Sequence, residues 1–161
     1  MTDAVDIDIT AAKKRVFDFV DSFHAAIAAQ NIQQIEQVTG ALILNKRNKY
    51  WRNFVFEVIR LPGSVTISPG RIASNGNRIE IFGYFNISGV CITREEVWLR
   101  YGRLPVIETP RPNAPDSEIV YVASFETSKL TFGFAQQSPN CLGSVGAAIL
   151  NPPPYPFGKP D

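Results

Sequence analysis

The spacing of apolar residues changes once along the chain, and few folds are compatible with such a change. Between residues 11 and 29 apolar side chains recur every three or four positions, whereas from Leu42 onward they alternate at every second position. The first spacing is typical of an amphipathic helix and the second of half-buried strands. The sequence therefore predicts helices followed by about six or seven mostly antiparallel strands, an α+β fold rather than alternating βαβ units.

Local signals set the expected helix ends. Thr10 is a candidate N-cap, and no Gly or Pro interrupts the chain up to Ala29. Gln30-Asn31 then predicts a break, and Gly40 predicts the end of a short second helix. The strands that follow carry apolar residues on both sides. We therefore expect the first helix to pack across the inner face of a strongly curved, cone-like sheet.

Turn signals divide the remaining chain into strands. Asn75-Gly76 predicts a hairpin between residues 65–74 and 77–87, because both residues tolerate the positive φ of a type I′ turn. A second hairpin is expected between residues 118–125 and 130–134. Residues 97–101 are expected to form another strand. Residues 142–150 fit a last strand or a short helix equally well.

The chain length of 161 residues fits one domain. We assign residues 1–150 to it and expect residues 151–161 to form an extended, proline-rich tail. Within that tail, Pro152 to Tyr155 matches the Pro-Pro-x-Tyr ligand of WW domains.

Composition excludes several protein classes. A 45% hydrophobic content with 19% charged residues is unlike a disordered chain. No apolar run approaches the roughly 20 residues that span a bilayer, and the acidic start is unlike a signal peptide. We therefore expect a soluble, cytoplasmic protein. Cys91 and Cys141 accompany a single histidine, which is too few ligands for the usual zinc site. We expect two buried small side chains rather than a bridge, and neither a metal nor a cofactor.

The net charge of +1 conceals a segregation. Residues 1–40 carry −3, residues 41–103 carry +6 and residues 104–161 carry −2. The densest basic stretch interleaves cations with aromatics, a composition that suits phosphate neutralisation and base stacking. A solvated turn between two apolar runs is the alternative. The stretch comprises Lys46, Arg47, Lys49, Tyr50, Trp51 and Arg52.

The order of elements resembles the nuclear transport factor 2-like superfamily, which includes ketosteroid isomerases and polyketide cyclases. Residues 16–27 and 30–35 are similar to its long first helix and short second helix, and residues 74–79 and 96–101 to a hairpin and a following strand. The resemblance implies a cone-shaped fold and a homodimer formed through the outer sheet face. Family members usually place a third helix where residues 42–59 indicate strand. Their catalytic Asp or His–Asp pair has no counterpart at a matching position.

Three functions fit these observations. The first is a pocket between helix and curved sheet that binds a small hydrophobic ligand or a protein partner. The second is a nucleic-acid or anion-binding surface built from the basic stretch. The third is an oligomeric scaffold that uses an apolar sheet face. The residues expected to line the pocket are Tyr84, Phe82, Phe56, Trp98 and His24.

No reaction is predicted, although three side chains have the chemistry of a general acid or base. His24 lies beside the apolar stripe of the first helix, where an ordinary hydrogen bond is the alternative role. Glu57 and Glu80 interrupt apolar strands, and burial would raise the pKa of either carboxyl. Each is equally suited to pair with an arginine on a neighbouring strand.

Overall fold

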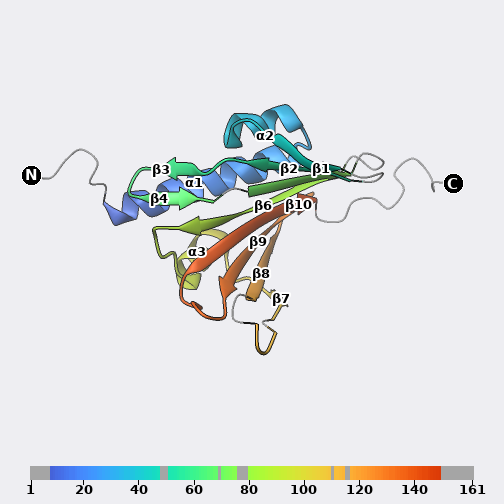
Figure 1. Ribbon diagram of the computed structural model, residues 1–161. Coiled ribbons are helices and arrows are strands. Elements are labelled where there is room, and N and C mark those ends of the chain that lie inside the picture. The colour runs from blue at the N-terminus through green and yellow to red at the C-terminus, as the bar shows by residue number, and fades with distance from the viewer. Residues whose placement is uncertain are drawn as a thin grey trace, which may run out of the picture.

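The fold is described from a computed structural model, over residues 8–47, 51–68, 70–75, 80–109, 111–114 and 117–149 (Figure 1). These ranges contain three helices and ten strands. The helices are α1 (Ile9–Ala28), α2 (Ile32–Thr39) and α3 (Arg94–Tyr101). The strands are β1 (Ile43–Arg47), β2 (Trp51–Phe56), β3 (Ile59–Leu61), β4 (Val65–Ile67), β5 (Gly70–Asn75), β6 (Glu80–Ser88), β7 (Val106–Glu108), β8 (Glu118–Ser124), β9 (Ser128–Ala135) and β10 (Leu142–Ile149).

The strands form one curved, antiparallel sheet in the order β1-β2-β5-β6-β10-β9-β8-β7. β4 pairs with the far end of β6 and with β3. The two expected hairpins are present as β5–β6 and β8–β9. Residues 142–149 form a strand, β10, at the centre of the sheet. The predicted α+β class, with helices on a curved antiparallel sheet, is therefore confirmed.

The helix ends follow local capping. α1 begins at Ile9 rather than after Thr10, because the Asp8 side chain accepts a hydrogen bond from the Thr10 backbone N–H at 3.2 Å. Asn31 caps α2 in the same way, accepting from the Gln34 N–H at 3.1 Å. Gly40 ends α2 as expected, with a φ of 84° that suits glycine.

Two strand predictions were wrong. Residues 97–101 belong to α3, whose first turn is fixed by a capping box between Thr93 and Glu96. Both side chains satisfy backbone N–H groups at the helix start, and this local stabilisation outweighs the two-residue alternation. The strand expected over residues 65–74 is split into β4 and β5. The proline-rich tail and the Asn-Gly turn lie outside the described residues.

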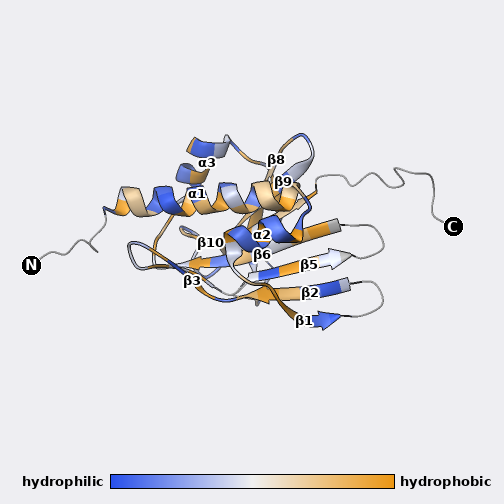
Figure 2. Ribbon diagram, turned by 90° about the horizontal axis from the view of Figure 1, so that it is seen from above, coloured by the Kyte–Doolittle hydropathy of each residue, from blue (hydrophilic) through white to orange (hydrophobic). Residues whose placement is uncertain are grey.

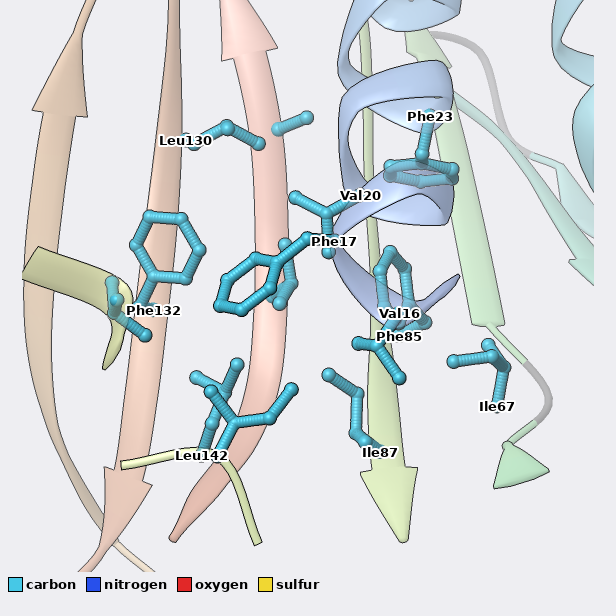
Figure 3. Close-up of a cluster of buried hydrophobic side chains, with 14 of the residues drawn as sticks. Val16, Phe17, Val20, Phe23, Ile67, Phe85, Ile87, Leu130, Phe132 and Leu142 are labelled. Atoms are coloured by element: carbon cyan, nitrogen blue, oxygen red, sulfur yellow. The ribbon is translucent and has the colours of Figure 1, made fainter. Parts of the chain in front are cut away.

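α1 packs its apolar stripe onto the inner face of the sheet, and α3 lies beside it (Figure 2). Phe23 of α1 and Phe85 of β6 meet edge to face, with ring centroids 5.0 Å apart, and both are fully buried. Figure 3 shows α1 side chains, including Val16, Phe17 and Val20, gathered with sheet residues such as Phe85 and Phe132, and all of them belong to one buried cluster. The space between α1 and the sheet is therefore packed core.

Replacing Phe23 with Ala should lower the free energy of unfolding by about 3–5 kcal/mol, because it leaves a cavity among fully buried rings. Urea denaturation followed by circular dichroism measures this loss. Leu99→Ala is the matched control, since Leu99 is 88% exposed and its truncation should change stability by less than about 0.5 kcal/mol. Equal effects of the two substitutions would contradict the assignment of the core.

Candidate functional site

His24 lies on the flank of α1 and contacts the start of β9. Its Nε2 is 2.6 Å from the Ser128 Oγ, and its ring centroid is 4.5 Å from that of Phe125. Burial lowers the pKa of His24 below its usual value, although the nearby Asp21 carboxylate opposes this shift. His24 is therefore neutral in the folded protein near pH 7.

These contacts superficially resemble a Ser-His-Asp arrangement, but they do not form a nucleophile site. Ser128 is only 3% exposed, which leaves a substrate no access to its hydroxyl. Asp21 accepts hydrogen bonds from Tyr101, at 2.7 Å, and from Arg100. The geometry instead gives His24 and Ser128 a structural role, because each satisfies the hydrogen-bonding capacity of the other where α1 meets the sheet.

Of the other two acid and base candidates, the structure describes the side chain of Glu57 alone. Glu57 is exposed in the link between β2 and β3. The backbone of Glu80 pairs with Asn75 at the start of β6, while its side chain lies outside the description.

The five residues expected to line one pocket lie in four different environments, one of which is that of His24 at the contact of α1 with β9. Phe56 is fully buried in the core under α1. Phe82 and Tyr84 point to the opposite, outer face of β6, where each is 41% exposed. Trp98 lies on α3, away from both. The prediction that side chains alternate along β6 was correct. Phe82 and Tyr84, however, were expected to face the helix, and they lie on the opposite face of the sheet.

The basic stretch is likewise divided by strand alternation. Lys46 pairs with Asn53, so its side chain lies on the outer face together with that of Trp51. Arg47 pairs with Arg52, and both lie on the inner side. Lys49 and Tyr50 lie outside the described residues.

Cys91 and Cys141 form a disulfide, so the expectation of two unbridged thiols was wrong. Sequence separation concealed the pairing, because Cys91 precedes α3 and Cys141 precedes β10. The sheet brings these two segments together, and the Leu142 N–H also donates to the Ile92 carbonyl at 2.8 Å. Disulfides persist mainly in oxidising compartments, so the bridge disagrees with the cytoplasmic expectation, which stays a prediction.

The bridge joins the two rims of a cleft between α3 and strands β8 and β9 of the sheet. The cleft has a volume of about 390 Å³. One rim is the first turn of α3, and the other is the segment before Cys141. Its floor comes from β8 and β9. The residues that line it are Thr93, Arg94, Glu95, Ile119, Tyr121, Phe134, Pro139 and Asn140.

The cleft combines an apolar floor with one available cation. Phe134 is 1% exposed and Tyr121 is 6% exposed, and their rings meet edge to face. The Arg94 guanidinium lies at the rim, 3.4 Å from the Tyr121 hydroxyl and 3.5 Å from a Glu95 oxygen. Both contacts are long, so a guanidinium with five N–H donors retains capacity for a ligand. The hydrogen bond with Tyr121 raises the pKa of Arg94, which keeps it cationic.

The Trp98 ring packs against Arg94 at this rim. It lies 4.6 Å from the Arg94 guanidinium carbon and 5.6 Å from that of Arg103. It also contacts the ring of Tyr121 edge to face, at 5.9 Å. The indole therefore positions Arg94 over the floor through cation–π contact.

Sequence reasoning missed this cleft because it assigned the α3 segment to a strand. The signal that could have found it is Thr93-x-x-Glu96, a capping-box pattern that predicts a helix start.

No protein-family model, curated protein or solved structure matches the chain. The nuclear transport factor 2-like resemblance therefore stays a prediction. In the described part of the chain, no helix has the length and apolar character needed to cross a membrane.

Replacing both cysteines with Ser should destabilise the fold by about 4 kcal/mol. The bridge closes a chain segment of 50 residues, and its removal restores that entropy to the unfolded state. Urea denaturation of wild type and the double variant measures the difference. Dithiothreitol should destabilise wild type to a similar extent and leave the variant unchanged. A wild type that is insensitive to the reductant would contradict this role.

Stability should fall as the pH drops below about 6.5. A lowered folded-state pKa means that the unfolded state binds a proton at His24 more tightly, so acid favours unfolding. His24→Gln should lose less stability than wild type between pH 7.5 and 5.5, as measured by thermal unfolding. Parallel losses in the two proteins would show that other groups cause the pH dependence.

Proposed function

We propose that this chain is a binding domain whose α3 cleft takes a small amphipathic anion, with an apolar body and a carboxylate head. The supporting observation is the Arg94 guanidinium, the one cation among the described lining residues, at the rim of a cleft with a buried aromatic floor. Ligand sites typically have this composition, in which apolar area supplies affinity and few polar groups set orientation.

The size and chemistry of the cleft define the ligand class. A volume of about 390 Å³ falls in the lower part of the range for small-molecule sites. Ile119, which is partly exposed, offers apolar surface to a chain or ring, and the buried rings of Tyr121 and Phe134 form the packed base beneath it. Arg94 offers parallel N–H groups that match the two oxygens of a carboxylate.

Several features hold the cleft in shape before a ligand arrives. The Cys91–Cys141 bridge ties its rims, and the capping box fixes the first turn of α3. Lys13 of α1 also pairs with Glu96 at 2.9 Å, which anchors the same turn. A rim that is already ordered spares a ligand the entropic cost of ordering it.

Octanoate is a suitable probe, because it joins a carboxylate to a short apolar chain. Titration followed by ¹⁵N–¹H NMR should give saturable shifts at the first turn of α3, at β8 and at Asn140. Arg94→Gln should weaken octanoate binding at least about 10-fold, since hydrogen bonds to a charged group contribute about 1.5–3 kcal/mol. Octanamide, which lacks the charge, should bind wild type and the variant with similar affinity.

Arg60→Gln is the matched control. It removes an exposed arginine from β3, which does not line the cleft, and should leave octanoate binding unchanged. Shifts that map elsewhere, or equal weakening by the two substitutions, would contradict the proposed site.

A further inference from the structure

The outer face of the sheet carries a row of aromatic side chains. α1 and α3 pack on the inner face, whereas Phe82 and Tyr84 project outward from β6 and are each 41% exposed. The Trp51 ring, from β2, lies 5.3 Å from that of Phe82. We call Trp51, Phe82 and Tyr84 the aromatic platform.

Small neighbouring residues explain why the platform is accessible. Trp51 and Phe82 come from strands separated by β5, and they meet because β5 presents only Ala73 opposite Phe82. On the other side, Gly146 pairs with Tyr84 and Ala148 follows two residues later on β10. These two residues leave a groove of about 220 Å³ beside Phe82 and Tyr84.

Among the described residues, three cations lie around the platform on the same face. Arg71 pairs with Tyr84 across β5 and β6. Lys129 lines the groove and pairs with Ala148. Lys46 projects outward from β1, two strands from Ala73. The arrangement places positive charge on both sides of the exposed rings.

A carboxylate marks one limit of this positive region. Glu118 reaches from β8 across Gly133, where there is no side chain in its way, and accepts a hydrogen bond from the Ser144 Oγ at 2.8 Å. Burial raises the pKa of Glu118, partly opposed by the hydrogen bond from Ser144. Ser144 lies two residues before Gly146, so the Glu118 carboxyl borders the platform beyond Tyr84.

We infer that the aromatic platform binds single-stranded nucleic acid, with bases stacked on Phe82 and Tyr84 and phosphates near Arg71, Lys129 and Lys46. Exposed aromatics supply the base contacts in such sites, and flanking cations supply the phosphate contacts. A duplex should bind more weakly, since its base faces are already stacked on each other. This inference is independent of the α3 cleft, because the two sites lie on opposite faces and have no lining residue in common.

Fluorescence anisotropy with labelled 20-mers of deoxythymidine and of uridine tests the inference, with a duplex 20-mer for comparison. Single strands should bind saturably at 50 mM salt. Affinity should fall roughly 20-fold by 200 mM salt if three phosphates are neutralised. Phe82→Ala and Tyr84→Ala should each weaken binding at least about 5-fold, because stacking contributes about 1–3 kcal/mol per base. The two labelled strands show whether the site prefers DNA or RNA.

Leu99→Ala is the control, since it truncates an equally apolar and more exposed side chain on α3. Arg71→Gln keeps the platform intact and should lower the magnitude of the salt slope by about 0.7. Trp98→Phe leaves Trp51 as the only tryptophan, whose fluorescence should be quenched by a bound single strand.

Absence of saturable binding at 50 mM salt would overturn the inference, as would equal losses with Phe82→Ala and Leu99→Ala. Sedimentation velocity adds a further outcome. A dimer that Phe82→Ala converts to a monomer, without any nucleic-acid binding, would assign the same face to a second copy of the chain instead.

Discussion

The packing of α1 on the inner face of the sheet is the interaction on which the rest of the structure depends. Its apolar stripe meets the inward side chains of β6, β9 and β10, and Phe23 and Phe85 are fully buried at their contact. Because strand side chains alternate, filling one face with core turns every second residue to the other face. Binding surfaces are therefore expected in two places that α1 does not cover. One is the inner face at β8 and β9, and the other is the outer face of the sheet.

α3 lies beside α1 on the inner face of the sheet, and the cleft is formed where its first turn meets β8 and β9. Val97 of this short helix is fully buried, and Trp98 and Tyr101 pack against the core through ring contacts with Tyr121 and Phe132. The pairs Lys13–Glu96 and Arg100–Asp21 connect it to α1, but partly exposed ion pairs contribute little stability individually. The Cys91–Cys141 bridge adds a covalent connection at the same end. The position of the short helix that borders the cleft therefore depends on aromatic packing together with ion pairs and a disulfide.

The sequence predicted those elements in which local pattern and global packing agree. The stripe of α1 and the alternation of side chains along β6 follow from spacing alone, and both were correctly predicted, although Phe82 and Tyr84 were expected on the side that faces the helix. α3 was misassigned because eight residues around Val97 satisfy both periodicities, and only the capping pair decides between them. The bridge and the cleft could not be predicted in this way, since they unite β8, β9, α3 and the start of β10 from distant parts of the chain. Long-range register, rather than residue type, determines which side chains meet.

The same register regroups the residues that the sequence placed in separate sites. Lys46 and Trp51 of the basic stretch join Phe82 and Tyr84 of the expected pocket, while Arg47 and Arg52 turn to the other side. β9 contributes to both surfaces, with Phe134 in the cleft and Lys129 beside the aromatic platform. Energetic coupling between two sites needs an element with two discrete arrangements. β9 is paired along its whole length between β10 and β8, and its inward side chains are fixed in the core. A strand held in this way has a single arrangement and cannot couple the two sites. Ligand binding in the cleft should therefore leave the affinity of the aromatic platform unchanged.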